Sequence, residues 1–200
     1  MIKTINLGVL GIDHGHIFDM LDEMLKEGCS CNYFWTQGSP LTLDEFSKKY
    51  PQIKRADNKS DILNDGTIDM ILISSIPKDR ANLSIDAMRA GKDVMVDKPG
   101  CTTLEQLNNL KQTVKDTGKI WSINFSERFH VAAVTKAEEL VAEGKIGKVK
   151  QTIGTGPHRQ GNYERPDWFY DRDSYGGIIT DIGSHQIHQF LVFTNSNEAK

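Results

Sequence analysis

The chain has 200 residues, of which 38% are hydrophobic and 26% charged, a balance typical of a folded globular protein. Its formal net charge is −3, from 24 basic and 27 acidic residues, and no basic stripe stands out. This charge pattern argues against nucleic acid or a membrane surface as the main partner. The length allows one complete domain and part of another.

The N-terminus and the cysteines indicate the expected compartment. The first residues run directly into a strand pattern and do not show the basic, apolar and small-residue segments of a signal peptide. No apolar run is long enough to cross a bilayer. Cys29, Cys31 and Cys101 are an odd number and make no disulfide framework. We therefore expect reduced cysteines and a cytoplasmic protein. A metal site at Cys29 and Cys31 is the weaker alternative, because two thiolates lack a second close pair.

Strand-like apolar runs alternate with helical patterns over the first 125 residues. Strands are expected at 5–10, 32–35, 68–75, 93–96 and 120–125. Helices are expected from 17 to before Gly28, from 42 to before Pro51, and at 81–90 and 102–117. Capping boxes at Thr42–Glu45 and Thr102–Glu105 would open two of them. This alternation predicts βαβ units, a parallel sheet and an α/β fold.

The alternation stops after Phe125, where we place a boundary between a first domain (1–125) and a second (126–200). The second part predicts a helix at 131–143, a strand near 149–155, and a polar, aromatic loop at 156–175. A last helical stretch follows Gly176 and Gly177 and ends near Phe193.

The first strand-to-helix turn is a degenerate form of the glycine fingerprint G-x-G-x-x-G. Gly11 matches its first glycine, whereas Asp13 stands at the second position and His16 at the third. A dinucleotide pyrophosphate would need this tight turn and the helix N-terminus behind it. The carboxylate of Asp13 would repel a phosphate unless it points away or caps the helix. The alternative is a plain strand-to-helix turn.

The end of the second strand should offer a carboxylate to the adenosine ribose, but the sequence there is Trp35-Thr36-Gln37-Gly38-Ser39. Either the 2′-phosphate of NADP is accepted, or Thr36, Gln37 or Ser39 holds the ribose of NAD. The choice between NAD and NADP stays open.

Two further segments carry chemistry. Lys98 follows a strand directly, where it could stabilise negative charge on a reacting oxygen or lie on a surface turn. Asp181, His185 and His188 would share one face of a helix starting near Thr180. A histidine with a neighbouring carboxylate suits general-base catalysis. The alternatives are ordinary hydrogen-bonded histidines or a metal site built from the same three side chains.

Taken together, these segments resemble the Gfo/Idh/MocA oxidoreductase family. The matching stretches are VLGIDHGH at 9–16, AMRAGKDVMVDKPG at 87–100, SERFH at 126–130, GKIGKV at 144–149 and GGIITDIGSH at 176–185. The resemblance implies a Rossmann doubly wound parallel sheet, then a C-terminal α/β (α+β) domain with an open sheet that commonly mediates homo-oligomerisation. Family members are longer than this chain, so that second sheet is expected to be truncated.

The resemblance also implies site residues. The family's E-K-P motif falls on Asp97-Lys98-Pro99 and its D-x-G-x-H motif on Asp181, Gly183 and His185, which makes Lys98, Asp181 and His185 the catalytic candidates. Cofactor-binding candidates are Gly11, Asp13, His14, Gly15, His16, Thr36, Ser75, Pro77 and Lys98. Substrate-binding candidates are Arg128, His158, Trp168 and His188, and no metal ligand is expected.

This sequence departs from the family at several positions. The fingerprint is degenerate at Asp13 and His16, and His188 stands where the family has a carboxylate. The histidine that usually follows the T-P-N turn is missing, because the residues at 76–81 read IPKDRA.

The expected function is hydride transfer between NAD or NADP and a secondary alcohol of a sugar, cyclitol or related polyol. His185 would take the hydroxyl proton, Lys98 would hydrogen-bond the same oxygen, and Asp181 would orient the group. One alternative is a non-catalytic nicotinamide-binding regulatory relative. The other is a metal-dependent hydrolase built on Asp181, His185 and His188.

Overall fold

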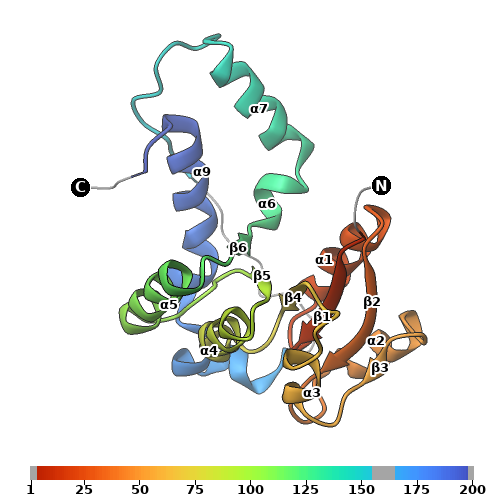
Figure 1. The fold of residues 1–200 in the computed structure, drawn as a ribbon. Coiled ribbons are helices and arrows are strands. Elements are labelled where there is room, and N and C mark those ends of the chain that lie inside the picture. The colour runs from red at the N-terminus through yellow and green to blue at the C-terminus, as the bar shows by residue number, and fades with distance from the viewer. Residues whose placement is uncertain (1–3, 155–164, 198–200) are drawn as a thin grey trace. The chain divides into compact units, whose positions relative to one another are not determined.

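The computed structural model describes residues 4–154 and 165–197, which form two compact units (Figure 1). The first unit holds residues 4–124 together with a returning segment, 165–176, and the second holds 125–154 and 177–197. The returning segment lies within the range expected for the second domain.

The first unit is built on a six-stranded sheet in the order β3-β2-β1-β4-β5-β6. Every pairing in this sheet is parallel. The strands are β1 (Asn6–Leu10), β2 (Ser30–Trp35), β3 (Lys54–Arg55), β4 (Met70–Ile73), β5 (Asp93–Asp97) and β6 (Trp121–Asn124). This is the strand order of the dinucleotide-binding fold, so the predicted Rossmann sheet is confirmed.

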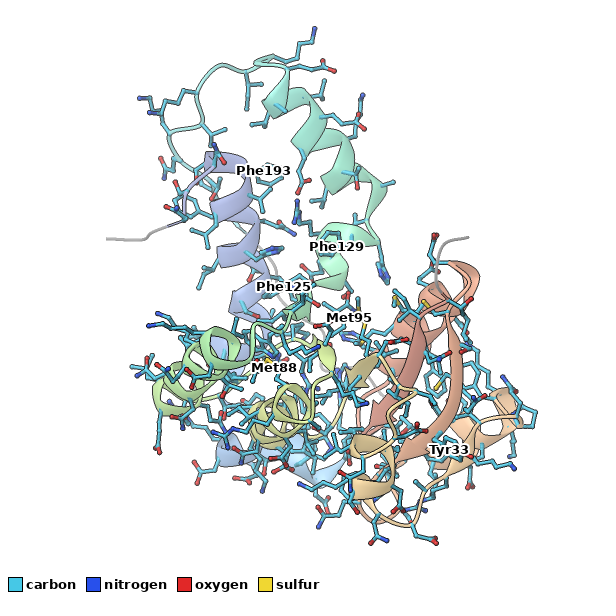
Figure 2. All side chains as sticks on the ribbon, viewed as in Figure 1. Tyr33, Met88, Met95, Phe125, Phe129 and Phe193 are labelled. Atoms are coloured by element: carbon cyan, nitrogen blue, oxygen red, sulfur yellow. The ribbon has the colours of Figure 1, made fainter. Side chains whose placement is uncertain are left out.

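Helices cover both faces of the sheet, as the alternation of the buried strand residues requires. Val9 and Leu72 pack in one core with α1 (His16–Lys26) and α2 (Leu43–Lys49). Leu10 and Ile73 point to the other core. That core is covered by α3 (Lys59–Leu63), α4 (Pro77–Arg89) and α5 (Leu104–Thr117). Met88 of α4 belongs to this second core (Figure 2).

Both predicted capping boxes were wrong in detail. Thr42 has helical backbone angles and makes no side-chain cap, because its hydroxyl donates to the carbonyl oxygen of Ile12 instead. At the other helix the cap lies one residue later, where the Thr103 hydroxyl accepts from the N–H of Gln106 at 3.1 Å. The Gln106 side chain accepts from the N–H of Thr102, the residue before the cap, so the reciprocal bond of a capping box is not formed and Glu105 takes no part.

The returning segment contains a 3₁₀-helix, η1 (Asp167–Tyr170), and a short helix, α8 (Arg172–Tyr175), which packs against α4. This region was predicted to be loop. Its helical turns depend on tertiary packing and on local caps. The carboxylate of Asp171 accepts from the N–H of Asp173 and from the hydroxyl of Ser174, which is buried.

The described part of the second unit is helical. It comprises α6 (Ser126–Phe129), α7 (Ala132–Ala142), a π-helical turn, η2 (Ile179–Gly183), and α9 (Ser184–Thr194). The predicted strand is absent from residues 149–154, and residue 155 lies outside the described chain. A strand needs a neighbour for its ladder, and no described strand pairs with this segment.

No helix among residues 4–154 and 165–197 is both long and apolar enough to cross a membrane.

We expect Phe46→Ala to lower the free energy of unfolding of the first unit by about 3–5 kcal/mol, because Phe46 is fully buried among the aromatic rings of Phe34 and Tyr50. Urea unfolding followed by circular dichroism would measure this change. Leu41→Ala, at a half-exposed position just before α2, is the control and should shift the midpoint little. A midpoint equal to that of the wild type would contradict the assigned core.

Candidate functional site

A cavity of about 1030 Å³ opens at the carboxyl ends of β1, β2 and β4. In parallel α/β sheets ligands bind at this edge, where the strand order reverses. The lining residues are Gly11, Asp13, Trp35, Gln37, Asp57, Asn58, Lys59, Ser60, Ser75, Ile76, Lys78, Asp79, Asn82 and Leu83.

Gly11 makes the turn at the floor of this cavity possible. Its φ is +79°, and a Cβ added there would lie 2.4 Å from the Cβ of Ser75 and 2.8 Å from its Cα. Its N–H donates to the carbonyl oxygen of Trp35 at 2.7 Å. Gly15, by contrast, has open space around its added Cβ, directly before α1. A tight turn followed by a helix N-terminus with open space around it leaves room for a pyrophosphate.

Asp13 lines the cavity beside this turn. The pKa of its carboxyl group is raised to about 6, chiefly by burial and also by the nearby charge of Asp79, although Arg80 and backbone hydrogen bonds act in the opposite direction. At neutral pH the group is therefore mostly ionised, and its charge is poorly solvated.

Because its folded pKa is raised, Asp13 disfavours the folded state above about pH 6, and this penalty disappears as the pH falls toward 3.8. We expect Asp13→Asn to melt at a higher temperature than the wild type at pH 7.5. The difference should shrink as the pH is lowered toward 4.5, in matched thermal melts. Asp173→Asn, at an exposed position, should show no such trend. A difference in melting temperature between Asp13→Asn and the wild type that stays the same at every pH would refute the raised pKa of Asp13.

A charged cluster lies at the end of β5, and sequence reasoning did not bring it together. Asp97 is fully buried, with His14 Nδ1 at 3.1 Å from Oδ2 and His16 Nδ1 at 2.8 Å from Oδ1. Arg80 Nη2 lies 2.9 Å from the same Oδ2. Despite burial, the charge of Arg80 and the histidine contacts hold the pKa of Asp97 well below its usual range. Burial lowers the pKa of His14, so this ring is neutral at pH 7.

His14, His16 and Asp97 are also the one group among the described residues whose donor atoms lie close enough to hold a metal ion. The guanidinium of Arg80 already neutralises Asp97, and its fixed charge would repel a dication. An ionised carboxylate accepts hydrogen bonds only, so a ring nitrogen that carries a proton fits each of the two contacts. The arrangement therefore favours a hydrogen-bonded network over a metal centre.

The end of β2 lies at the same cavity, which is lined by Trp35 and Gln37. Thr36 between them is buried, and its hydroxyl oxygen has no hydrogen-bond partner in the described chain. Arg55 Nη2 donates to the carbonyl oxygens of Thr36 at 3.0 Å and Gly38 at 2.7 Å, which fixes the loop after the strand. An unused buried hydroxyl at this position fits a ribose-binding role.

The other cofactor candidates flank the ends of β4 and β5. Ser75 lines the cavity, and Pro77 is the first residue of α4. Lys98 follows β5 and is buried, at 4% exposure, so it does not lie on an exposed turn. The Lys98–Pro99 peptide bond is cis.

The second segment with candidate catalytic residues lies in the second unit. Asp181 belongs to the π-helical turn η2, and His185 lies in the first turn of α9; both are buried. The expected helix is present, but its start is π-helical rather than α-helical, so Asp181 and His185 are not spaced by a regular α-turn. His185 Nε2 lies 3.9 Å from Glu127 Oε1, and the ring meets Phe125 edge-on.

His188 stacks on Phe125, with ring centroids 4.1 Å apart and planes inclined by 17°. Phe125 directly precedes α6 and Phe129 ends it (Figure 2), and the ring centroid of Phe129 lies 6.5 Å from that of His188. Partial burial and the charge of Arg128 lower the pKa of His188. In the described chain Asp181, His185 and His188 are not grouped as metal ligands, which weakens the hydrolase alternative.

The four substrate-binding candidates are placed differently. Arg128 forms a two-point ion pair with Glu138, through Nε at 2.5 Å and Nη2 at 3.3 Å. Trp168 belongs to the returning segment, and its ring centroid lies 6.2 Å from that of His14. His188 packs on Phe125 as described, and His158 lies outside the described residues.

Comparison with known families matches both parts of the chain. Residues 39–125 match the oxidoreductase family with an NAD-binding Rossmann fold, and residues 134–199 match the GFO/IDH/MocA C-terminal domain.

Individual relatives agree with the match to an oxidoreductase family. The chain is 24% identical to scyllo-inositol 2-dehydrogenase (NADP(+)) of Bacillus subtilis, covering 95% of this chain and 52% of that protein. It is 27% identical to D-xylose dehydrogenase of Paenarthrobacter nicotinovorans, covering 70% of this chain and 37% of that protein. The chain thus spans about half, or less, of the length of these curated relatives.

Two solved structures share the fold. A proposed oxidoreductase from Erwinia carotovora atroseptica is 40% identical, with a TM-score of 0.92 over 96% of this chain and 57% of that one. Levoglucosan dehydrogenase in complex with NADH is 20% identical, with a TM-score of 0.75 over 96% of this chain and 54% of that one, a likeness that concerns the fold alone.

Proposed function

The chain belongs to the Gfo/Idh/MocA oxidoreductase family, and from this premise we propose that it is an NAD(P)-dependent dehydrogenase. Its substrate would be a secondary alcohol of a sugar, cyclitol or related polyol. The observation that supports this best is the large cavity at the β1/β4 edge, with Gly11 and Ser75 at its floor. The sugar and cyclitol dehydrogenases among the relatives favour the same substrate class.

The first unit would hold the dinucleotide. Gly11, Asp13 and Ser75 line the cavity, and Gly15 leaves the start of α1 open. The unpartnered hydroxyl of Thr36 would bind the adenosine ribose. His14, His16, Pro77 and Lys98 complete the proposed set. When bound, the nicotinamide supplies the acceptor or donor of a hydride.

Three side chains would act on the substrate. The ammonium group of Lys98 would hydrogen-bond the reacting oxygen and stabilise negative charge on it. His185 would take the hydroxyl proton at an imidazole nitrogen, and Asp181 would orient the proton acceptor. Both His185 and Asp181 are buried, which would limit competition from water.

Arg128, His158, Trp168 and His188 are proposed as substrate contacts. The position of the Trp168 ring beside His14 supports its assignment, because it brings an aromatic surface to the histidine cluster of the first unit. The ion pair of Arg128 with Glu138 would hold that guanidinium in a fixed orientation.

We also propose a cytoplasmic location and a homo-oligomer formed through the second domain. Cys29, Cys31 and Cys101 are all free thiols, as expected of a reducing compartment.

A fluorescence titration of the purified protein with NADH and, separately, NADPH tests the proposal. Saturable binding of either supports it and identifies the preferred cofactor. Gly11→Ala should abolish binding, because φ is positive and the new Cβ would collide with Ser75, whereas Gly66→Ala has open space and should bind normally. No binding by folded wild-type protein would refute the proposal. Binding without turnover on a polyol panel would indicate a regulatory relative instead.

A further inference from the structure

Arg80 is almost completely buried, at 1% exposure, in the first turns of α4. Its guanidinium contacts the chain at the carboxyl ends of both β4 and β5, which are neighbours in the sheet. Nε donates to the carbonyl oxygen of Ser75 at 2.8 Å. Nη1 donates to the carbonyl oxygens of Asp97 at 3.1 Å and Pro99 at 3.3 Å, and to that of Lys98 between them. Nη2 lies 2.9 Å from the Asp97 carboxylate.

These contacts fix the backbone that carries Lys98. Carbonyl oxygens that are buried need donors, and here three successive ones share a single nitrogen. A guanidinium presents its five donors in a rigid planar fork, whereas a lysine ammonium is a compact point charge on a flexible stem. A lysine at position 80 could keep the ion pair with Asp97 but could not reach both Ser75 and the carbonyls at 97–99.

The same side chain joins two parts of the proposed machinery. Ser75 lines the dinucleotide cavity and Lys98 is the proposed catalytic lysine. Asp97 also contacts His14 and His16, which follow the glycine turn. The guanidinium comes from the segment 76–81, which reads IPKDRA and directly follows Ser75.

We propose that Arg80 is a positioning residue for Lys98, a role that rests on the proposed dehydrogenase function. It fixes the backbone of residues 97–99 relative to the cofactor cavity, so that the lysine ammonium is preorganised for the reacting oxygen. Arg80 itself does not touch substrate. Displacing a catalytic group by about 1 Å lowers the rate by about 100-fold, which sets the scale of the expected effect.

The first test needs no activity. Hydrogen exchange of peptides spanning 94–101 and 74–76 should become at least about tenfold faster in Arg80→Lys, while exchange in β1 stays as in the wild type. Arg89→Lys is the matched control, since Arg89 lies exposed on the same helix and should change neither peptide. Wild-type protection of residues 94–101 in Arg80→Lys would overturn the positioning role, whether or not the protein is a dehydrogenase.

The second test uses turnover of wild-type enzyme on its best polyol. Arg80→Lys should lower kcat by about 100-fold, with the KM for the polyol and the Kd for the nicotinamide nearly unchanged. A merely structural defect would weaken binding and stability together. If hydrogen exchange at 94–101 becomes faster in Arg80→Lys but kcat stays at the wild-type value, the catalytic part of the inference is overturned. If the wild type binds no nicotinamide, the proposed function fails, and the exchange result still decides the placement of residues 97–99.

Arg80→Lys could fail to fold, because Asp97 is fully buried beside it. In that case Arg80→Gln combined with Asp97→Asn replaces it. This pair removes both buried charges at once, so no unpaired charge remains, yet it also removes the guanidinium bonds to the carbonyls. Faster exchange at 94–101 in this variant supports the inference, and unchanged exchange overturns it.

Discussion

Lys98→Met is expected to lower kcat by about 10²–10³-fold while NADH or NADPH binds nearly as tightly as in the wild type. The proposed task of the ammonium group is to stabilise negative charge on the reacting oxygen, which develops mainly in the transition state. Methionine keeps most of the length and apolar volume of the side chain at this buried position. The loss should therefore reflect the missing charge rather than a cavity.

Steady-state kinetics and fluorescence titration of the same preparations separate the two effects. Lys115→Met, at an exposed position on α5, is the control and should behave as the wild type does. A kcat within about threefold of the wild-type value would exclude Lys98 from the chemistry. An equal loss of cofactor affinity would indicate that Lys98 serves mainly in binding.

His185→Asn should lower kcat by about 10²–10⁴-fold and flatten the limb of the pH–rate profile that reports the base. Asparagine preserves a polar side chain of similar shape at a site with 3% exposure. His130→Asn, exposed in the same unit, is the matched control. An unchanged pH–rate profile in His185→Asn would assign the proton transfer to another group.

The double variant of Lys98 and His185 tests whether the two units act in one step. If both residues stabilise the same transition state, the combined loss should be smaller than the product of the single losses. Fully multiplicative losses would mean that they act independently.

Much of the first unit follows from the sequence because buried parallel strands read as short apolar runs. The segments leading to Leu10, Ile73 and Val96 were each assigned to a strand, and the structure places all three in the sheet. The sequence pattern was less informative about helix starts. Thr42 and Thr103 both precede helices. Only tertiary context determines that the Thr42 hydroxyl bonds to Ile12, whereas the Thr103 hydroxyl caps the N-terminus of α5.

The charged cluster could not be derived from spacing. His14, Arg80 and Asp97 are far apart in the chain, and their meeting depends on which strand ends the fold makes adjacent. One signal was present: Arg80 is the charged residue among the buried positions of α4, which also include Ala81 and Ser84. A charge among buried side chains implies a buried partner, and Asp97 is the last residue of the next strand, β5.

The second unit was harder to predict because local pattern does not determine it. Residues 149–154 have strand-like composition but no described neighbour with which to pair. The π-helical turn before His185 cannot be distinguished from an α-turn by hydrophobic spacing. The catalytic roles proposed for Asp181 and His185 therefore come from the motif D-x-G-x-H rather than from hydrophobic spacing.

The return of segment 165–176 to the first unit has a consequence for the order of events on the ribosome. The ribosome has synthesised all six strands of the sheet before it adds the residues of α8. During that interval α4 lacks the neighbour that packs on it in the finished protein. Domains usually mature from the N-terminus as they are synthesised, but here the helices α6 and α7 are made before the first unit can be completed. The face of α4 that packs on α8 thus stays uncovered until translation has passed Gly176.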